Sequence, residues 1–369
     1  MAHIARRTLL ATPAAALAAA PREGRVIASG DGLRLSPAEF GALLERLTRD
    51  GKLAADSFSR GGVVEQLEQR IAAALGKEAA VYFPTGTLAN HFAARLLAGD
   101  RRRVLIQAES HLYNDSGDCA QTLSNLNLVP LASGKAWFSA DEVHQHAERA
   151  KGSRVDVPVG AIVIESPVRR KQGEVFPFDE MKKVCAAARE HGIGLHLDGA
   201  RLFLAPPYTQ STVRAYAALF DTVYVSLYKY FNAPAGAILA GPRKLLDNAY
   251  HGRRMFGGGV NQSWPNAAVA LHYFEGFEER FGAAVRHSEK LKSALEKHAA
   301  FRVGRVAGGT NVWTLELASG DAAKFRRKLA AQRIELPAPV DRKFTLGVNE
   351  SWASATGEQL AEACVKALG

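Results

Sequence analysis

The stretch HLDGARLF, residues 196–203, places an acid and a base close together directly after an apolar run. Asp198 follows the run IGLHL, and Lys229 follows a second apolar run, TVYVSLY. In open sheets of parallel strands, ligands bind at the carboxyl ends of the strands. We therefore expect Asp198, Arg201 and Lys229 to meet at one edge of a sheet and to form the centre of a binding site.

A third segment offers a place for an anion. The sequence VYFPTGTLAN, residues 81–90, predicts a strand that leads into Gly86 and Thr87 and then into a helix. The first turn of a helix has unpaired N–H groups and the positive end of the helix dipole, and glycine lets a ligand approach the backbone closely. The spacing differs from that of a Walker P-loop, so the segment predicts a phosphate cradle of another kind.

A phosphate cradle, a carboxylate and a lysine are together what pyridoxal 5'-phosphate requires. The amine of Lys229 would form a Schiff base with the aldehyde, and Asp198 would keep the pyridine nitrogen protonated by pairing with its charge. Each part has a plainer interpretation when taken alone. Lys229 could be a surface lysine at a strand end, Asp198 a turn residue, and the TGT sequence an ordinary loop.

Apolar runs that alternate with helical patterns supply the sheet. Six runs predict buried strands, at residues 80–83, 104–107, 161–165, 193–197, 222–227 and 237–240. Helical patterns separate them, among them residues 63–75, which end at Gly76, and residues 178–192. Strands that are apolar on both faces and separated by helices indicate an α/β fold with a mostly parallel sheet. From roughly Phe281 the pattern changes to that of a smaller α+β domain.

Four segments resemble, in this order, the threonine aldolases, a branch of the β-eliminating lyase superfamily: VYFPTGTLAN, AAAREHGIGLHLDGARLF, SLYKYFNAPAGAILAG and RRMFGGGVNQ. The resemblance runs from about Asp56 to Asn266 and is most specific at HLDGARLF and the lysine segment. It implies the aminotransferase-like architecture of fold type I. The predicted parts are an N-terminal segment (21–55), a large cofactor-binding domain (56–280) and a small C-terminal domain (281–369). The resemblance also implies a homodimer or homotetramer with shared active sites.

The resemblance assigns roles on the cofactor side of the site. Lys229 would be the Schiff-base lysine and Asp198 the partner of the pyridine nitrogen, while Gly86 and Thr87 would hold the phosphate. Arg254 falls where the family has a lysine near the phosphate, one able to reach across a dimer interface. His111, in ESHLYNDSGD, falls where the family stacks a histidine on the cofactor ring, from which it can also move protons.

On the substrate side, Arg201 would face the cofactor edge and the substrate carboxylate, which a planar guanidinium grips through two oxygens. Arg342, in DRKFTLGVNES, would be a second carboxylate arginine, and Ser29, in VIASGDG, the small polar residue of the N-terminal segment. Alternatives remain open for three of these residues. Arg201 could form a structural salt bridge, His111 could cap a strand end, and Arg342 could be a surface residue.

The sequence departs from the family at three places. The segment ESPVRR, with Ser166 to Arg170, replaces an Asn-Thr-His-Asn sequence, so a histidine that helps to read a β-hydroxyl is missing. Asn261 stands in place of an arginine and Phe58 in place of a tyrosine. The implied reaction is cleavage of Cα–Cβ in a β-hydroxy-α-amino acid to glycine and an aldehyde, with His111 taking the hydroxyl proton. The altered segment leaves β-elimination, racemisation or transamination open.

The composition constrains the partners. The formal net charge of +10 comes from short, separated arginine clusters without interleaved aromatic residues, which favours a small anionic substrate over nucleic acid. A non-catalytic cofactor- or nucleic-acid-binding protein remains a further alternative. No apolar run is long enough for a membrane span. The three cysteines have no metal or disulfide spacing, so no metal is expected.

The first residues, 1–20, have a different character. Arg6 and Arg7 precede an Ala/Leu run over residues 8–20 that contains small residues suited to cleavage. This pattern is typical of a twin-arginine export signal and predicts a periplasmic protein. The alternative is an Ala-rich N-terminus on a cytoplasmic protein.

Overall fold

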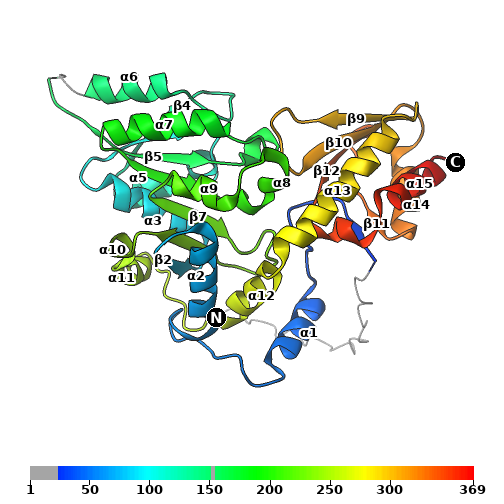
Figure 1. Ribbon diagram of the computed structural model, residues 1–369, viewed down its shortest axis with the longest axis horizontal. Coiled ribbons are helices and arrows are strands. Elements are labelled where there is room, and N and C mark those ends of the chain that lie inside the picture. The colour runs from blue at the N-terminus through cyan, green and yellow to red at the C-terminus, as the bar shows by residue number, and fades with distance from the viewer. Residues whose placement is uncertain (1–23, 151–153) are drawn as a thin grey trace, which may run out of the picture.

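A computed structural model describes residues 24–150 and 154–369 of the chain. Within these residues the larger sheet has seven strands (Figure 1). In spatial order they are β2 (Ala79–Phe83), β8 (Ala237–Gly241), β7 (Thr222–Ser226), β6 (Gly194–Asp198), β5 (Val159–Glu165), β3 (Arg103–Gln107) and β4 (Asn127–Leu131). The strands from β7 to β4 are parallel, and β8 is antiparallel to β2 and β7. The predicted mostly parallel sheet is confirmed.

Six of these strands agree with the predicted apolar runs to within two residues. The remaining strand, β4, contains Pro130 and was not predicted. Proline cannot donate a ladder hydrogen bond, so it is confined to positions such as sheet edges. β4 is the edge strand beside β3, where the missing N–H leaves no neighbour unpaired. The predicted export signal, residues 1–20, lies outside the described residues.

Helices cover both faces of this sheet, because alternate residues of a strand point to opposite sides. On β5, Ile162 and Ile164 pack in one cluster with α7, whereas Ala161 and Val163 pack in another with α3. The covering helices on the first side are α2 (Gly62–Leu75), α7 (Phe178–Glu190) and α9 (Val213–Ala218), with α6 (Ala140–Ala150) packed on α7. On the second side they are α3 (Gly86–Ala98) and α5 (Cys119–Ser124) (Figure 1).

A smaller antiparallel sheet lies in the C-terminal part, at the right of Figure 1. Its order is β12 (Lys343–Gly347), β10 (Val312–Leu317) and β9 (Phe301–Arg305), with α14 (Ala322–Ala331) and α15 (Gly357–Leu368) beside it. The N-terminal segment joins this part, since β1 (Val26–Ile27) pairs in parallel with β11 (Ile334–Glu335). Together with the larger sheet, this arrangement confirms the predicted aminotransferase-like fold of type I.

One long helix, α13 (Phe277–Leu295), joins the two sheets, and the boundary predicted near Phe281 falls inside it. At its start, Phe277 packs on the ring of Phe231 with a centroid distance of 5.3 Å. Phe231 follows Lys229 by two residues, so the helix also anchors the lysine segment. The other helices are α1 (Pro37–Thr48), α4 (His111–Asn114), α8 (Pro206–Thr209), α10 (Arg243–Leu246), α11 (Ala249–Met255), α12 (Trp264–Phe274), η1 (Arg169–Lys171), η2 (Leu202–Leu204) and η3 (Glu350–Ser354).

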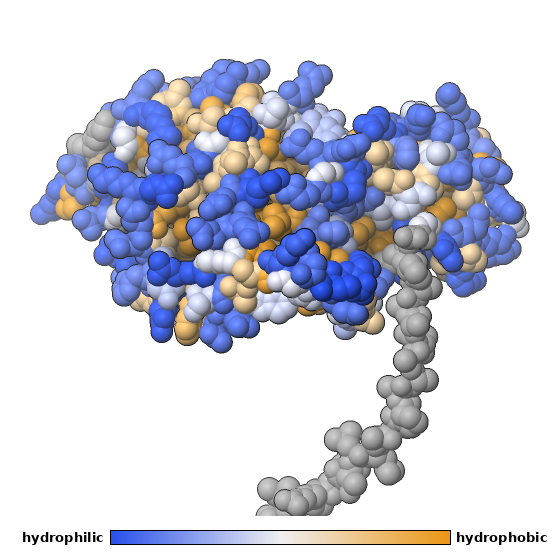
Figure 2. Space-filling view, turned by 60° about the horizontal axis from the view of Figure 1, so that its bottom comes forward, coloured by the Kyte–Doolittle hydropathy of each residue, from blue (hydrophilic) through white to orange (hydrophobic). Residues whose placement is uncertain are grey.

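Hydrophilic residues cover most of the face that Figure 2 shows, and hydrophobic residues are visible in the gaps between them. Among the described residues, no helix has the length and apolar character needed to cross a lipid bilayer. The same residues contain no cluster of three or more His, Cys, Asp or Glu side chains arranged to hold a metal ion.

Candidate active site

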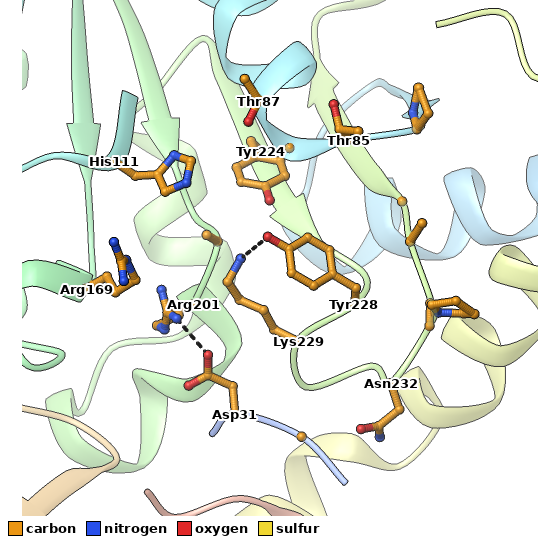
Figure 3. A pocket seen from close by; sticks show the side chains of 18 of the residues that line it. Asp31, Thr85, Thr87, His111, Arg169, Arg201, Tyr224, Tyr228, Lys229 and Asn232 are labelled. Carbon is orange, nitrogen blue, oxygen red and sulfur yellow. Dashed lines mark hydrogen bonds and ion pairs between the residues drawn. The ribbon is translucent and has the colours of Figure 1, made fainter. Parts of the chain in front are cut away.

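A cavity of about 980 Å³ lies at the carboxyl ends of β5, β6 and β7 (Figure 3). Four parts of the chain contribute to its wall. The strand ends and the segments after them supply Glu165, Arg169, Asp198, Arg201, Tyr228 and Lys229. The start of α3 supplies Thr85, Gly86, Thr87 and Asn90, the start of α4 supplies His111, and the N-terminal segment supplies Asp31, Gly32 and Arg34. The predicted meeting of Asp198, Arg201 and Lys229 at one sheet edge therefore occurs.

Lys229 extends its amine into the centre of this cavity (Figure 3). The amine nitrogen Nζ donates to the Tyr228 hydroxyl at 3.1 Å and to Ser226 Oγ at 3.3 Å. It also lies 4.3 Å from the centre of the Tyr228 ring. Among the described residues no carboxylate forms an ion pair with Lys229, and both hydrogen-bond partners of its amine are neutral.

Asp198 is 2% exposed and lacks a cationic partner at ion-pair distance among the described residues. Its carboxylate accepts from Asn90 Nδ2 at 2.6 Å and from the Ala200 N–H at 3.1 Å. Asn90 in turn bonds His196 Nε2 at 2.9 Å, which fixes the direction of the Asn90 amide. Burial raises the pKa of Asp198, although His111 and Lys229 oppose this effect. A buried, oriented carboxylate of this kind would be stabilised by a bound cation.

The segment predicted to be an anion cradle lies at the start of α3, which borders the cavity. Thr85 is the N-cap, and its hydroxyl accepts from the Leu88 N–H at 3.2 Å, which leaves other first-turn N–H groups for a ligand. Thr87 points into the cavity (Figure 3). A Cβ on Gly86 would collide with the hydroxyl of Tyr224, so only glycine lets the tyrosine and the helix start lie together.

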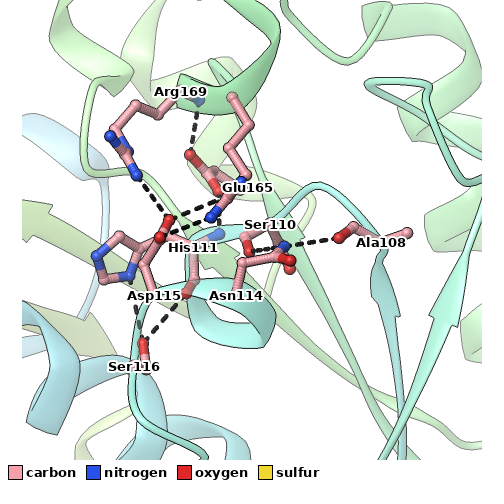
Figure 4. A network of polar contacts seen from close by, with 9 residues as sticks. Ala108, Ser110, His111, Asn114, Asp115, Ser116, Glu165 and Arg169 are labelled. Carbon is pink, nitrogen blue, oxygen red and sulfur yellow. Dashed lines mark hydrogen bonds and ion pairs between the residues drawn. The ribbon is translucent and has the colours of Figure 1, made fainter.

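His111 forms the opposite wall, at the first residue of α4 (Figure 4). Its backbone N–H donates to Glu165 Oε2 at 2.6 Å, and its Nδ1 lies 3.4 Å from Ser116 Oγ. Burial lowers the pKa of His111, and the positive charges of Lys229 and Arg169 lower it further. The neutral imidazole, which is able to accept a proton, is therefore favoured.

Glu165 organises this wall, and sequence reasoning did not assign it a role. The side chain is 2% exposed and accepts from the backbone N–H groups of His111 and Arg169, the latter at 2.9 Å. Burial and the charge of Asp198 raise the pKa of Glu165 to about 7. The sequence signal that could have identified Glu165 is its place as the last residue of the apolar run AIVIE. The neighbouring strand β6 ends at Asp198, so the two carboxyl groups lie at the same edge of the sheet.

Arg201 combines the two interpretations that the sequence left open. Its Nη2 forms an ion pair with Asp31 Oδ2 at 2.8 Å, and the guanidinium also lines the cavity (Figure 3). Asp31 is a second residue that sequence reasoning missed, two positions after Ser29. The N-terminal segment reaches the site because the Leu33 N–H donates to Asn232 Oδ1 at 2.6 Å, next to the lysine segment.

Three predicted site residues lie outside this cavity. Ser29 lines a separate cavity of about 650 Å³ between the N-terminal segment and α14. Arg342 is exposed, and its carbonyl accepts from the Leu317 N–H. Arg254 lies over the ring of Phe58, with its Cζ 5.2 Å from the ring centre. The departures Phe58 and Asn261 are neighbours here, because the Phe58 N–H donates to the Asn261 carbonyl at 2.7 Å.

The curated relatives include a threonine aldolase and a racemase. The low specificity L-threonine aldolase of Saccharomyces cerevisiae is 31% identical over 208 residues, which are 56% of this chain and 53% of the yeast protein. The alanine racemase TOXG of Cochliobolus carbonum is 29% identical over 258 residues, 69% of this chain and 62% of that protein. The match thus spans about half to three fifths of the length of these relatives.

Among solved structures, a Listeria monocytogenes EGD-E protein provisionally described as an L-allo-threonine aldolase has a TM-score of 0.73 and 29% sequence identity. The alignment covers 94% of this chain and 97% of that one. The sequence profile of the family described as Beta-eliminating lyase matches residues 51–318. This match includes the lysine segment, Asp198, the α3 cradle and His111. The chain therefore belongs to the β-eliminating lyase family.

Proposed function

We propose that the protein is a pyridoxal-phosphate-dependent lyase that cleaves Cα–Cβ of a β-hydroxy-α-amino acid to glycine and an aldehyde. One observation carries the proposal: a lysine amine without a carboxylate partner, a buried carboxylate without an ion-pair partner and a helix N-terminus line one cavity. The family is pyridoxal-phosphate dependent, and several relatives are named as threonine aldolases.

The cavity residues fit the cofactor. The α3 start, with Gly86 and Thr87, would hold the phosphate, and Asp198 would supply the negative charge that a protonated ring nitrogen needs. Lys229 has an amine without a carboxylate partner and would bond the aldehyde. When bound, pyridoxal phosphate withdraws electrons from the bonds at the substrate α-carbon.

Arg201 would orient the substrate. A guanidinium has five N–H donors, and the ion pair with Asp31 uses Nη2. Asp31 is itself bonded by Asn311 Nδ2 at 3.3 Å, so the ion pair fixes the plane of the guanidinium. Its remaining donors would bind the substrate carboxylate and thereby decide which bond at the α-carbon lies perpendicular to the cofactor ring.

His111 would take the proton from the β-hydroxyl. The Glu165 contact fixes the backbone of His111, and burial lowers the pKa of its imidazole, which favours the neutral form. Nδ1 faces Ser116, and none of the described residues bonds Nε2, which is therefore free to accept a proton. General base catalysis of this kind typically contributes a factor of about 10² to 10⁴ in rate.

Product identification tests the proposal. Holoenzyme incubated with L- and D-isomers of threonine and allo-threonine should release glycine and acetaldehyde in equal amounts. Lys229→Ala protein under the same conditions serves as the control for reaction with free cofactor. Ammonia and an oxoacid as products would instead identify a β-elimination.

A second candidate, racemisation, has one observation in its favour. The segment after Glu165 contributes Arg169 to the cavity and contributes no histidine. One relative is named as an alanine racemase. The altered segment equally leaves β-elimination and transamination as alternatives. A racemase would exchange the α-proton of alanine with deuterium from solvent without releasing glycine, which proton NMR in deuterium oxide detects.

We further propose a homodimer or homotetramer. Near Arg254, Met255 and Phe58 are exposed large hydrophobic residues, and such patches are typical of association surfaces. Sedimentation equilibrium at micromolar concentration tests this proposal directly. Glu substitution at Met255 should shift the protein toward the monomer, and an unchanged assembly would exclude this surface.

Export to the periplasm is proposed from residues 1–20 alone. Proteins with twin-arginine signals are exported in the folded state, which suits a chain that binds its cofactor beneath a folded sheet. Replacing Arg6 and Arg7 with lysine should retain an uncleaved, cofactor-loaded protein in the cytoplasm. Wild-type protein found in the cytoplasm with its first residues intact would exclude export.

A further inference from the structure

Arg169 and Arg170 share one carboxylate (Figure 4). Arg169 Nη2 lies 2.7 Å from Asp115 Oδ2, and Arg170 Nη2 lies 2.8 Å from Asp115 Oδ1. Arg170 also donates from Nε to Oδ2 at 3.3 Å, so it can hold Asp115 alone. Two guanidinium groups and one carboxylate leave a surplus positive charge at this wall.

Only one of the two arginines lines the cavity. Arg169 lies beside His111 and on the same side of Lys229 as Arg201 (Figure 3), whereas Arg170 is not among the residues that line the cavity. The backbone of Arg169 is fixed by its N–H bond to Glu165 at 2.9 Å. Its side chain lines the cavity near His111, which would receive the β-hydroxyl proton.

Among the other charged residues of the cavity, Glu165 and Asp198 are acidic, and Arg201 and Arg34 are basic. The charge of Arg201 is matched by Asp31 at 2.8 Å. Arg34 also lines the cavity, and among the described residues it has no ion-pair partner. The α-carboxylate of an amino acid supplies one negative charge. Arg34 and the Arg169–Arg170 pair therefore carry positive charge that no ion pair of the described residues matches, and a second negative charge on the substrate would meet it.

We infer that Arg169 selects substrates whose side chain carries a second acidic group. A planar guanidinium binds a carboxylate through two parallel hydrogen bonds, and Arg170 keeps Asp115 paired when Arg169 turns to the substrate. The inference rests on the proposed function for the identity of the bond that is cleaved. The substrate class is then a β-hydroxy-α-amino acid with an acidic side chain, of which 3-hydroxyaspartate is the simplest.

The cleavage balances for this substrate. The Cα–Cβ bond breaks, the hydroxyl proton passes to His111, and the hydroxyl-bearing carbon becomes the aldehyde carbon of glyoxylate. The α-carbon keeps the electron pair, takes a proton and leaves as glycine. No oxidant, reductant or other co-reactant is needed.

A binding experiment tests the inference without turnover. Aspartate and asparagine have nearly the same shape and differ in side-chain charge, and neither carries a β-hydroxyl. Calorimetric titration of the holoprotein should show aspartate binding at least about tenfold more tightly than asparagine, as expected for a charge-assisted hydrogen bond. Equal affinities would overturn the inference.

Three variants separate recognition from general electrostatics. Arg169→Gln should remove the preference for aspartate, whereas Lys171→Gln, which deletes a neighbouring charge outside the lining, should keep it. Arg169→Lys should give an intermediate ratio, because the charge remains while the two-pronged geometry is lost. Loss of the preference in both glutamine variants, or in neither, would contradict a specific role for Arg169.

Turnover distinguishes the inference from the proposed function. A holoenzyme that cleaves threonine at least as efficiently as 3-hydroxyaspartate would leave the lyase proposal in place and overturn the acidic substrate class. A holoenzyme that cleaves neither but binds aspartate through Arg169 would support the recognition and contradict the lyase.

Discussion

Glu165 and Asp198 are paired residues at the ends of two adjacent parallel strands, and each is only 2% exposed. Neither carboxylate has an ion-pair partner among the described residues. Burial raises the pKa of both side chains, and for Glu165 the value is about 7. The two carboxyl groups line the same cavity as Lys229 and His111. A cationic ligand bound there would offset the free-energy cost of burying their negative charge.

The raised pKa of Glu165 predicts a pH dependence of stability. The folded state holds the proton up to about pH 7 and the unfolded state only up to about 4.5, so the folded state binds more protons between these values. Stability therefore falls as pH rises through this window, by roughly 3 kcal/mol from Glu165 if the full shift applies.

Urea denaturation of the apoprotein across this window measures the effect. Glu165→Gln should give a flatter pH profile than the wild type, because the amide does not titrate. Glu68, whose pKa is also about 7, contributes equally to both proteins, so it cancels in the difference. Identical profiles would contradict the assignment of the shift to Glu165.

Asp198→Asn should separate cofactor binding from cofactor chemistry. The amide removes the charge that a protonated ring nitrogen needs but keeps the shape of the side chain. We expect turnover to fall by at least about a hundredfold, since the charge acts on the electron-withdrawing ring. Absorbance after gel filtration should show that the cofactor is retained. Near-normal turnover would contradict the role of Asp198.

Gly86→Ala should weaken cofactor binding. The added Cβ would meet the Tyr224 hydroxyl, so either the tyrosine or the first turn of α3 must move. We expect the dissociation constant for pyridoxal phosphate to rise at least about tenfold. Gly41→Ala is the matched control, because a Cβ there meets no atom within 4 Å. Equal affinity of the two variants for pyridoxal phosphate would contradict a role for Gly86 in phosphate binding.

Arg201→Gln should raise KM for the amino acid substrate. Loss of a charge-assisted pair to a carboxylate corresponds to an increase of about ten- to a hundredfold. Arg342→Gln is the comparison, since Arg342 is exposed and outside the cavity lining. A similar rise in both variants would show that Arg342 also binds the carboxylate in the working protein.

The sheet and the place of Asp198, Lys229 and the α3 start at one cavity were predictable because their signals are local, whereas Arg254 lies outside that cavity. An apolar run followed by Asp198, or a strand followed by Gly86 and Thr87, is visible within ten residues of sequence. The ion pair of Asp31 with Arg201 was not predictable, because it depends on where the N-terminal segment returns. The sequence identified Arg169 only as part of the segment that departs from the family. Its place in the cavity depends on the hydrogen bond between its backbone N–H and Glu165.

The most direct test of the account is covalent trapping of the cofactor. Holoprotein loaded with pyridoxal phosphate is reduced with borohydride, digested with a protease, and analysed by mass spectrometry. The account predicts that the cofactor mass is found on the peptide that contains Lys229 and that Lys229→Ala protein, folded by circular dichroism, yields no labelled peptide. Label on another lysine, or none in the wild type, would contradict it.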